Sequence, residues 1–405
     1  MHGGRRRKNI ALCLALLLLA GLYAPAQAAN GEEAGKHSTT VMVYLCGGDL
    51  ERFFGAATED IREMAGSGFD SRYTTLLIMA DGMGSRKGDP DMGKTVIIEI
   101  GAHGMRTVRH SEKALNMADG ETLKAFLDYG YAQYPAERHA LILWGHGGGP
   151  LEGMVCDGQT DGDSLSLEEI RAALDESFPA REKLSWIGFD ACLMATLETA
   201  LSVADYADCL IASQAREESS GWNYSFLRGL ERDEDGAATA QRILRASAGS
   251  AAEDLQTLSC IRLDRIGALR EETERYFGKL RSFLTEDSAT VFLENREKAA
   301  AFGSTEDGAQ DLVDLVSLSE QWEPVPGCGE ALRKAVREAV ICSEATVAGA
   351  NGISVFCPDL REKEAAERWT EYSQRFGYLF PDYIRFFSAL FPAADKQNIA
   401  FSDQT

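Results

Sequence analysis

Two stretches, Leu141-Ile-Leu-Trp-Gly-His146-Gly-Gly-Gly149 and Trp186-Ile-Gly-Phe-Asp-Ala-Cys192-Leu-Met194, decide the fold class of this 405-residue chain. Each is a short apolar run that ends in a turn carrying a reactive side chain. Such runs are typical of strands buried on both faces of a parallel sheet. Because the functional groups of open α/β sheets lie beyond the carboxyl ends of the strands, we expect both turns at one edge of the sheet.

The alternation of apolar strands and amphipathic helices continues on both sides of these stretches. It predicts strands at 39–45, 74–80, 140–144, 184–189 and 208–213, a hairpin at 94–109, and helices at 56–65, 120–134, 167–177 and 193–203. Farther along, it predicts helices at 237–255, 265–283, 289–301, 311–321 and 329–345, strands at 257–262 and 352–356, and a docked helix within 372–391. The sequence therefore predicts an α/β fold with a mostly parallel sheet and a helical C-terminal half.

The N-terminus has the order of a secretory signal peptide. Residues 1–28 contain a basic cluster, an apolar run from Ile10 to Leu22 and small residues up to Ala28. The apolar run is shorter than the roughly 20 residues that span a bilayer, so we expect cleavage and no stable membrane insertion. The prediction is a secreted, periplasmic or cell-surface protein with a linker at 29–38, a catalytic region at 39–230 and a largely helical region at 231–405 that packs on the same sheet.

Composition narrows the class of partner. The formal net charge is −22, and removal of residues 1–28 would take away four basic residues and no acidic one. Such a surface disfavours nucleic acid. The nine cysteines include no CxxC pair, which argues against a zinc ribbon or a disulfide scaffold. We expect a monomer.

His146 and Cys192 together suggest nucleophilic catalysis. His146 precedes three glycines, which let the backbone approach another group closely, and the Gly147 N–H is a candidate oxyanion-hole donor. Cys192 is predicted at a helix start, where the dipole would stabilise a thiolate. Either residue alone is more often a packed or solvated side chain. Their order and 46-residue separation resemble those of caspase-type enzymes and favour a Cys/His dyad.

The chain resembles the clostripain family of cysteine peptidases through Leu143-Trp-Gly-His-Gly-Gly148, Gly188-Phe-Asp-Ala-Cys-Leu-Met-Ala195 and Gly221-Trp-Asn-Tyr224. The resemblance implies a caspase-like three-layer α/β/α sandwich and cleavage after Arg or Lys. It also implies that Asp190 lies in the pocket for the basic side chain, where a carboxylate would pair with guanidinium or ammonium. The alternative is that Asp190 caps the following helix.

The segment after the next strand is predicted to form another wall of the cleft. Ser213, Gln214 and Trp222 are its candidate substrate-binding residues, and the alternative for Trp222 is loop packing. The chain departs from the family at Gly145, where a polar residue is more common, and at Ala215, where an acidic residue usually follows Ser-Gln.

A partial EF-hand loop starts at residue 157. Its candidate calcium ligands are Asp157, Asp161, Asp163 and Glu168. However, Ser166 and Glu169 already form a capping-box pattern, and a strand instead of a helix precedes the loop. We expect that catalysis by a Cys/His dyad requires no cofactor. Whether this loop binds calcium stays open.

The leading hypothesis is a secreted cysteine endopeptidase that acts on proteins or peptides with basic residues through an acyl-enzyme intermediate. The first alternative is a secreted binding or adhesion module that keeps the scaffold without turnover, since fold does not fix function. The second is a structural protein stabilised by disulfides.

Overall fold

The computed structural model describes residues 37–81, 94–155, 163–177, 183–217, 220–230, 235–247, 257–303, 309–362, 364–392 and 394. The predicted signal peptide and most of the predicted linker lie outside these ranges. No helix in the described part is long and apolar enough to cross a membrane.

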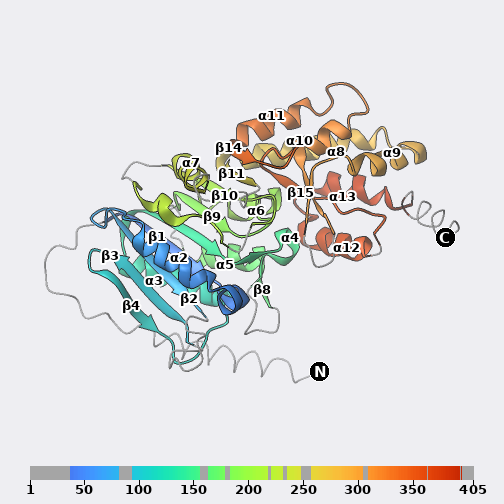
Figure 1. The fold of residues 1–405 in the computed structure, drawn as a ribbon. Coiled ribbons are helices and arrows are strands. Elements are labelled where there is room, and N and C mark those ends of the chain that lie inside the picture. The colour runs from blue at the N-terminus through green and yellow to red at the C-terminus, as the bar shows by residue number, and fades with distance from the viewer. Residues whose placement is uncertain are drawn as a thin grey trace, which may run out of the picture.

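Within the described ranges, a nine-stranded sheet organises the molecule (Figure 1). Its order is β14 (Val340–Ala345), β11 (Thr257–Arg262), β10 (Cys209–Ala212), β9 (Trp186–Asp190), β5 (Ala136–Trp144), β1 (His37–Leu45), β2 (Thr74–Ala80), β3 (Val96–Gly101) and β4 (Gly104–His110). The strands from β10 to β2 run parallel, whereas β3 and β4 at one end and β11 and β14 at the other are antiparallel. The predicted parallel strands and the hairpin are confirmed.

Helices cover both faces of the sheet. α3 (Gly120–Gln133), α5 (Leu167–Ser177) and α6 (Leu197–Val203) contribute to one core, and α2 (Ala56–Gly66) and α7 (Gly236–Ser247) to the other. Successive side chains of a strand point to opposite faces. Accordingly, Met42 and Tyr44 of β1 join the first core, while Val41 and Val43 join the second. The three-layer α/β/α fold is confirmed.

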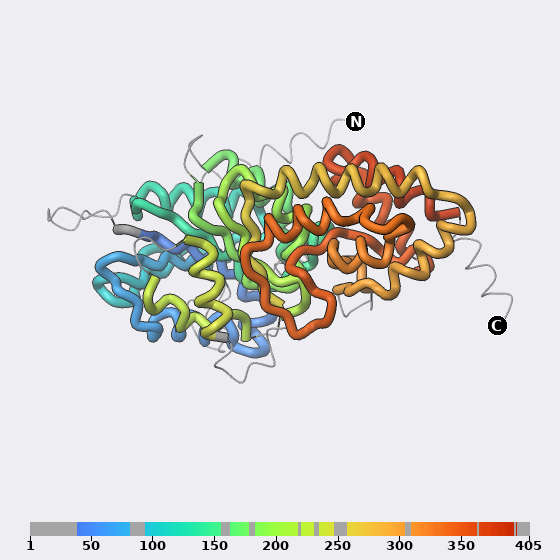
Figure 2. Tube along the Cα trace, turned by 90° about the horizontal axis from the view of Figure 1, so that it is seen from above, coloured from blue at the N-terminus to red at the C-terminus, as the bar shows by residue number. Residues whose placement is uncertain are grey.

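The C-terminal region contributes to the large sheet and also builds a body of its own. Its strands β11 and β14 complete one end of the sheet. Beyond them lie α8 (Ile266–Arg281), α9 (Glu286–Arg296), α10 (Leu315–Gln321), α11 (Glu330–Ala339), α12 (Ala365–Phe376), α13 (Pro381–Ser388) and a small sheet of β12 (Ala301–Phe302), β13 (Leu312–Asp314) and β15 (Ser354–Phe356). Figure 2 shows that these elements form one end of an elongated molecule.

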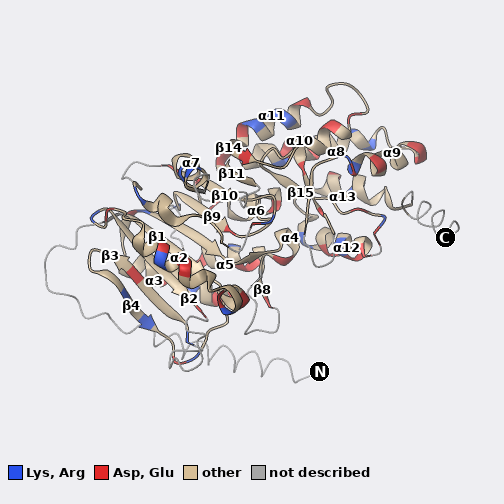
Figure 3. Ribbon diagram, viewed as in Figure 1, with Lys and Arg blue, Asp and Glu red and all other residues tan. Residues whose placement is uncertain are grey.

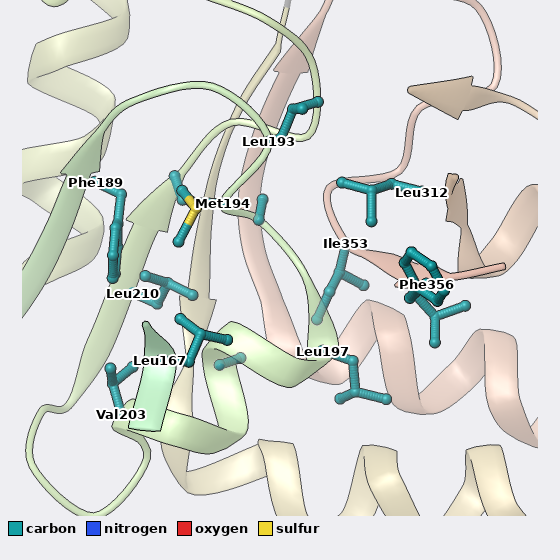
Figure 4. Packing of buried hydrophobic residues seen from close by; sticks show 14 of the residues in the cluster. Leu167, Phe189, Leu193, Met194, Leu197, Val203, Leu210, Leu312, Ile353 and Phe356 are labelled. Carbon is teal, nitrogen blue, oxygen red and sulfur yellow. The ribbon is translucent and has the colours of Figure 1, made fainter. Parts of the chain in front are cut away.

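A continuous apolar core joins this body to the layers that cover one face of the large sheet. In this core, Leu193 and Leu197 lie close to Leu312, Ile353 and Phe356 of the C-terminal part (Figure 4). The backbone N–H of Ser354 also donates to the carbonyl oxygen of Ala195 at 2.9 Å. The chain directly after Cys192 is therefore held by residues from the C-terminal half.

Several helix predictions were partly wrong, including 289–301, which ends at Arg296. The predicted helix 329–345 ends at Ala339 and continues as β14, where Val340 and Ile341 favour an extended edge strand. The predicted helix 311–321 starts with β13 and becomes helical at Leu315. There, the Asp314 side chain caps α10 by accepting the N–H of Ser317 at 2.8 Å.

The charged residues are spread over both halves of the molecule. Figure 3 shows acidic residues on helices throughout the fold, with basic residues between them.

Candidate active site

The candidate base, His146, follows β5 directly and is held by a carboxylate. Its Nε2 lies 2.9 Å from Oδ1 of Asp49, which stands in the turn after the neighbouring strand β1. The two side chains are 40% and 29% exposed. His146 also begins β6 (His146–Gly147), which pairs with β7 (Met154–Val155). One ring nitrogen is thus committed to Asp49, and the other is left for chemistry.

The turns after β5 and β9 meet because these strands are parallel neighbours, with Trp144 opposite Asp190. A Cβ atom at Gly147 would lie 2.0 Å from the carbonyl oxygen of Cys192, so only glycine permits this approach. The predicted meeting of the two strand ends is confirmed at the level of the backbone.

The predicted helix start at Cys192 was wrong. α6 begins at Leu197 after the N-cap Thr196, whose side chain accepts the N–H of Thr199. Cys192 lies in the preceding turn, where Leu193 has a φ of 67° and donates its N–H to the carbonyl of Ala215 at 3.0 Å. Because α6 begins five residues after Cys192, its dipole does not act directly on the thiol.

The environment of the thiol opposes ionisation. Burial raises the pKa of Cys192 above its usual value. The backbone N–H of Glu217, the charge of Arg216 and the N–H groups of Cys192 and Gly147 act in the opposite direction. The Glu217 N–H lies 3.2 Å from Sγ, and Sγ lies 3.6 Å from the Glu217 carbonyl oxygen. A thiolate here depends on a base and on these donors.

Asp190 points away from α6 and towards the loop after β10. Its Oδ1 accepts the backbone N–H of Trp222 at 3.1 Å, and its Oδ2 accepts the Tyr224 hydroxyl at 2.8 Å. Gly221 has a φ of 59°, and a Cβ there would lie 2.9 Å from Oδ1. The alternative of a helix cap is wrong, because Asp190 instead anchors the loop carrying the Gly-Trp-Asn-Tyr motif.

A second carboxylate, that of Glu217, adjoins Asp190. Within the described part of the chain, Oε2 of Glu217 is buried without a hydrogen-bond partner. Burial and the charges of Asp190 and Cys192 raise the pKa of Glu217. Burial also raises the pKa of Asp190 to about 6. Buried carboxyl groups with raised pKa values next to a nucleophile mark a functional site.

A third acid lies behind this pair. Burial and the charge of Asp190 raise the pKa of Asp60 on α2 to about 9, although Trp144 Nε1 donates to its Oδ2 at 2.7 Å. The backbone N–H of Tyr224 donates to Glu63, also on α2. Three carboxyl groups near Cys192, those of Asp60, Asp190 and Glu217, therefore have raised pKa values, and burial favours their neutral forms.

The three loop residues predicted to bind substrate are in fact buried. Gln214 donates to Ser354 at 2.7 Å and to Asp314 at 3.1 Å, and Ser213 bonds to Thr257 at 2.7 Å. Trp222 packs against Gly188, where a Cβ would lie 2.7 Å from the ring. These side chains position the loop and present no face to a substrate, so loop packing accounts for Trp222.

The candidate calcium loop is only partly described. Asp157 and Asp161 lie outside the described residues. Glu168 forms a two-pronged ion pair with Arg375, and Asp163 accepts from Asn116. The capping box of Ser166 and Glu169 is present. Among the described residues, no group of three or more His, Cys, Asp or Glu side chains could hold a metal ion.

Two site residues were missed at the level of sequence. Asp49 follows the first apolar strand in a Gly-Gly-Asp turn, the same arrangement that drew attention to His146 and Cys192. That signal was available. Glu217 carried no comparable signal, because its role depends on the path of the loop around Asp190.

The sheet, the adjoining turns that carry His146 and Cys192, and the buried carboxyl groups near the thiol are the arrangement expected of a thiol-dependent hydrolase with a caspase-like fold. A model of the clostripain family, Peptidase C11, matches residues 43–380. The chain therefore belongs to the clostripain family of cysteine peptidases.

Individual relatives agree with this assignment. Clostripain of Hathewaya histolytica is 27% identical over 231 residues, covering 49% of this chain and 43% of that protein, so the match spans less than half of the relative's length. A secreted C11 cysteine protease from Bacteroides thetaiotaomicron, solved with an irreversible peptide inhibitor, has a TM-score of 0.64 at 19% identity and covers 87% of this chain and 99% of its own. An inactive zymogen C11 protease from Parabacteroides distasonis has a TM-score of 0.67 at 18% identity and covers 86% and 99%. These two structures support the fold.

Proposed function

We propose that the protein is an exported cysteine endopeptidase that cleaves after Arg or Lys, with Cys192 as nucleophile and His146 as proton carrier. The observation that carries the proposal is the contact of the Gly147 backbone with Cys192, which joins the histidine turn to the cysteine turn. The N-terminal pattern of residues 1–28 supports export.

In the proposed acylation step, Cys192 transfers its proton to Nδ1 of His146, since Nε2 is bonded to Asp49. The thiolate attacks the peptide carbonyl carbon, and the N–H groups of Gly147 and Cys192 stabilise the oxyanion. The C–N bond then breaks, and His146 gives its proton to the leaving amine. The product is a thioester on Cys192.

In the proposed deacylation step, water attacks the thioester while His146 takes its proton. The C–S bond breaks, a carboxylic acid leaves, and the proton returns to the thiolate. Every group in this cycle is a protein group, so the proposal requires no cofactor. The Glu217 carbonyl that contacts Sγ must give way when a peptide binds.

We assign the preference for basic residues to Glu217 and Asp190. The free oxygen of Glu217 would accept a guanidinium or ammonium, with Asp190 supplying a second negative charge behind it. A bound cation would lower the pKa values of both acids, so substrate binding would release a proton.

The test is a panel of fluorogenic peptides ending in Arg, Lys, Asp or Leu before the reporter. Each is assayed under reducing conditions, with and without calcium, on wild type and Cys192→Ala. The expected result is cleavage after Arg and Lys that Cys192→Ala abolishes. Cleavage by Cys192→Ala at the wild-type rate would overturn the mechanism. Absence of cleavage, combined with no selective alkylation of Cys192, would favour the binding module instead.

A further inference from the structure

Three cysteines meet on the sheet away from the catalytic turns. Cys209 lies on β10, Cys260 on β11 and Cys342 on β14, and these strands are neighbours in the sheet. All three side chains pack into the same core on one face of the sheet. None of them has a role in the proposed peptidase chemistry.

The strand register sets two of these cysteines directly opposite each other. Cys260 and Cys342 are Cα partners in the antiparallel pair of β11 and β14. Directly opposed residues of such a pair have Cβ atoms within about 5.5 Å, close to the range of a disulfide. Cys209 is a diagonal neighbour of Cys260 across the β10–β11 pair. The residue directly opposite Cys260 is Ile211, which lies two positions after Cys209 on the same strand.

The three thiols also differ in access and acidity. Cys260 is fully buried, whereas Cys342 is partly exposed on the edge strand. Contact with the thiols of Cys209 and Cys342 raises the pKa of Cys260. The Cys260 thiol in turn lowers the pKa of Cys342 to about 7. Cys342 is therefore the member of the cluster that an external reagent meets first, and its contact with Cys260 favours the thiolate form.

We propose that Cys260 and Cys342 are a reversible disulfide site that links β14 to β11, with a low-molecular-weight disulfide as oxidant. The Cys342 thiolate attacks the reagent, forms a mixed disulfide and releases one small thiolate. The Cys260 thiol then attacks Cys342 Sγ, and its proton passes to the second small thiolate, which leaves as a thiol. Two protein thiols are oxidised, and one external disulfide is reduced to two thiols.

The bridge would close the long chain segment between the two strands and so restrict the unfolded state. It would also hold the strand that supports the active-site loop. Oγ1 of Thr257, three residues before Cys260 on β11, accepts the backbone N–H groups of Gln214 and Ala215 at 3.0 and 2.9 Å. Oxidation is expected to stabilise this end of the sheet.

The experiment uses the full chain carrying Cys192→Ala, so that its outcome is independent of peptidase activity. Protein is incubated with oxidised or reduced glutathione, denatured without reductant, and analysed by thiol counting and peptide mapping. A second variant, Cys342→Ser, removes the entry thiol. Cys328→Ser, at a partly buried loop cysteine, is the matched control.

The expected result is two fewer free thiols, a linked peptide pair containing Cys260 and Cys342, and a higher melting temperature that reductant reverses. Cys342→Ser should lose all three effects, and Cys328→Ser should keep them. The reduced melting temperature of each variant shows whether it folds. A full thiol count after oxidation, a persistent mixed disulfide on Cys342, or a Cys209–Cys260 link would each overturn the assignment.

Discussion

The histidine side and the cysteine side of the catalytic centre are built in opposite ways. His146 and Asp49 form one half-exposed pair on neighbouring strand ends. Cys192, by contrast, contacts a loop in which Oε2 of Glu217 is buried and whose path depends on the C-terminal half. The base can exchange protons with solvent, whereas burial fixes the electrostatics around the nucleophile. Catalysis and selectivity should therefore respond to different substitutions.

The contact between the two sides should be the most sensitive point. In Gly147→Ala, the new Cβ would lie 2.0 Å from the Cys192 carbonyl oxygen, so the turns must separate. Because this displaces a proposed oxyanion donor, kcat should fall about a hundredfold to a thousandfold. Steady-state kinetics with an Arg peptide measures the effect. Gly66→Ala, at a helix end with no atom within 4 Å of the new Cβ, is the control. Unchanged kcat in Gly147→Ala would show that the two turns need not touch.

The histidine side alone is tested by Asp49→Asn. Asp49 is a positioning residue: it holds Nε2 of His146 and so presents the other nitrogen to the thiol. We expect kcat to fall by about a hundredfold with little change in KM, because substrate contacts remain. Asp49→Glu should recover part of the loss, and Asp70→Asn, which breaks a surface pair with Arg72, should have no effect. If the free energy of unfolding falls by as much as the activation free energy for kcat rises, Asp49 has a structural role only.

Sequence patterns predicted the turn that carries His146 better than the turn that carries Cys192, for a physical reason. His146 and its glycines act through local geometry at a strand end, which apolar periodicity reveals. The pinned turn at Leu193 depends on a hydrogen bond to Ala215, more than twenty residues away in the sequence. The burial of Gln214 depends on Asp314 and Ser354, more distant still. Such contacts leave no periodic signal in one sequence.

The same reasoning explains the errors in the C-terminal half. The 329–345 segment has helical spacing, yet Val340 begins β14 because β11 offers an edge with which to pair. Pairing between distant strands overrides local preference. The strand at 74–80 was predicted with the bounds that the structure has, because it is a continuous apolar or β-branched run that ends before Asp81. The strand at 257–262 was also predicted with its observed bounds.

On the cysteine side, Glu217→Gln should alter selectivity more than rate. The substitution replaces the Glu217 carboxylate, whose Oε2 has no hydrogen-bond partner, by an amide. It removes negative charge from the place where the basic side chain of the substrate is proposed to bind. We expect kcat/KM for Arg and Lys peptides to fall about tenfold, with no loss for a Leu peptide. Asp190→Asn is the informative partner, because Asp190 also anchors Trp222 and Tyr224. That variant should lower both selectivity and melting temperature. An equal loss on all peptides in Glu217→Gln would exclude its role in selectivity.

The smallest effect is expected at Asp60, which tests whether the cysteine side is stabilised by bound protons. Burial raises the pKa of Asp60 from the usual 3.8 to about 9, so between these pH values the folded state keeps a proton that the unfolded state has released. The stability linked to this proton is complete below about pH 4 and is lost progressively as the pH rises to about 9. Stability should therefore fall by about 1 kcal/mol per pH unit from one such group. Asp60→Asn should flatten this slope in urea titrations between pH 7 and 9. Glu176→Gln, at an exposed position on α5, should leave it unchanged. If Asp60→Asn has the same slope as the wild type, Asp60 is already ionised in the folded protein at these pH values. The carboxyl groups near Cys192 would then carry more negative charge than their burial favours.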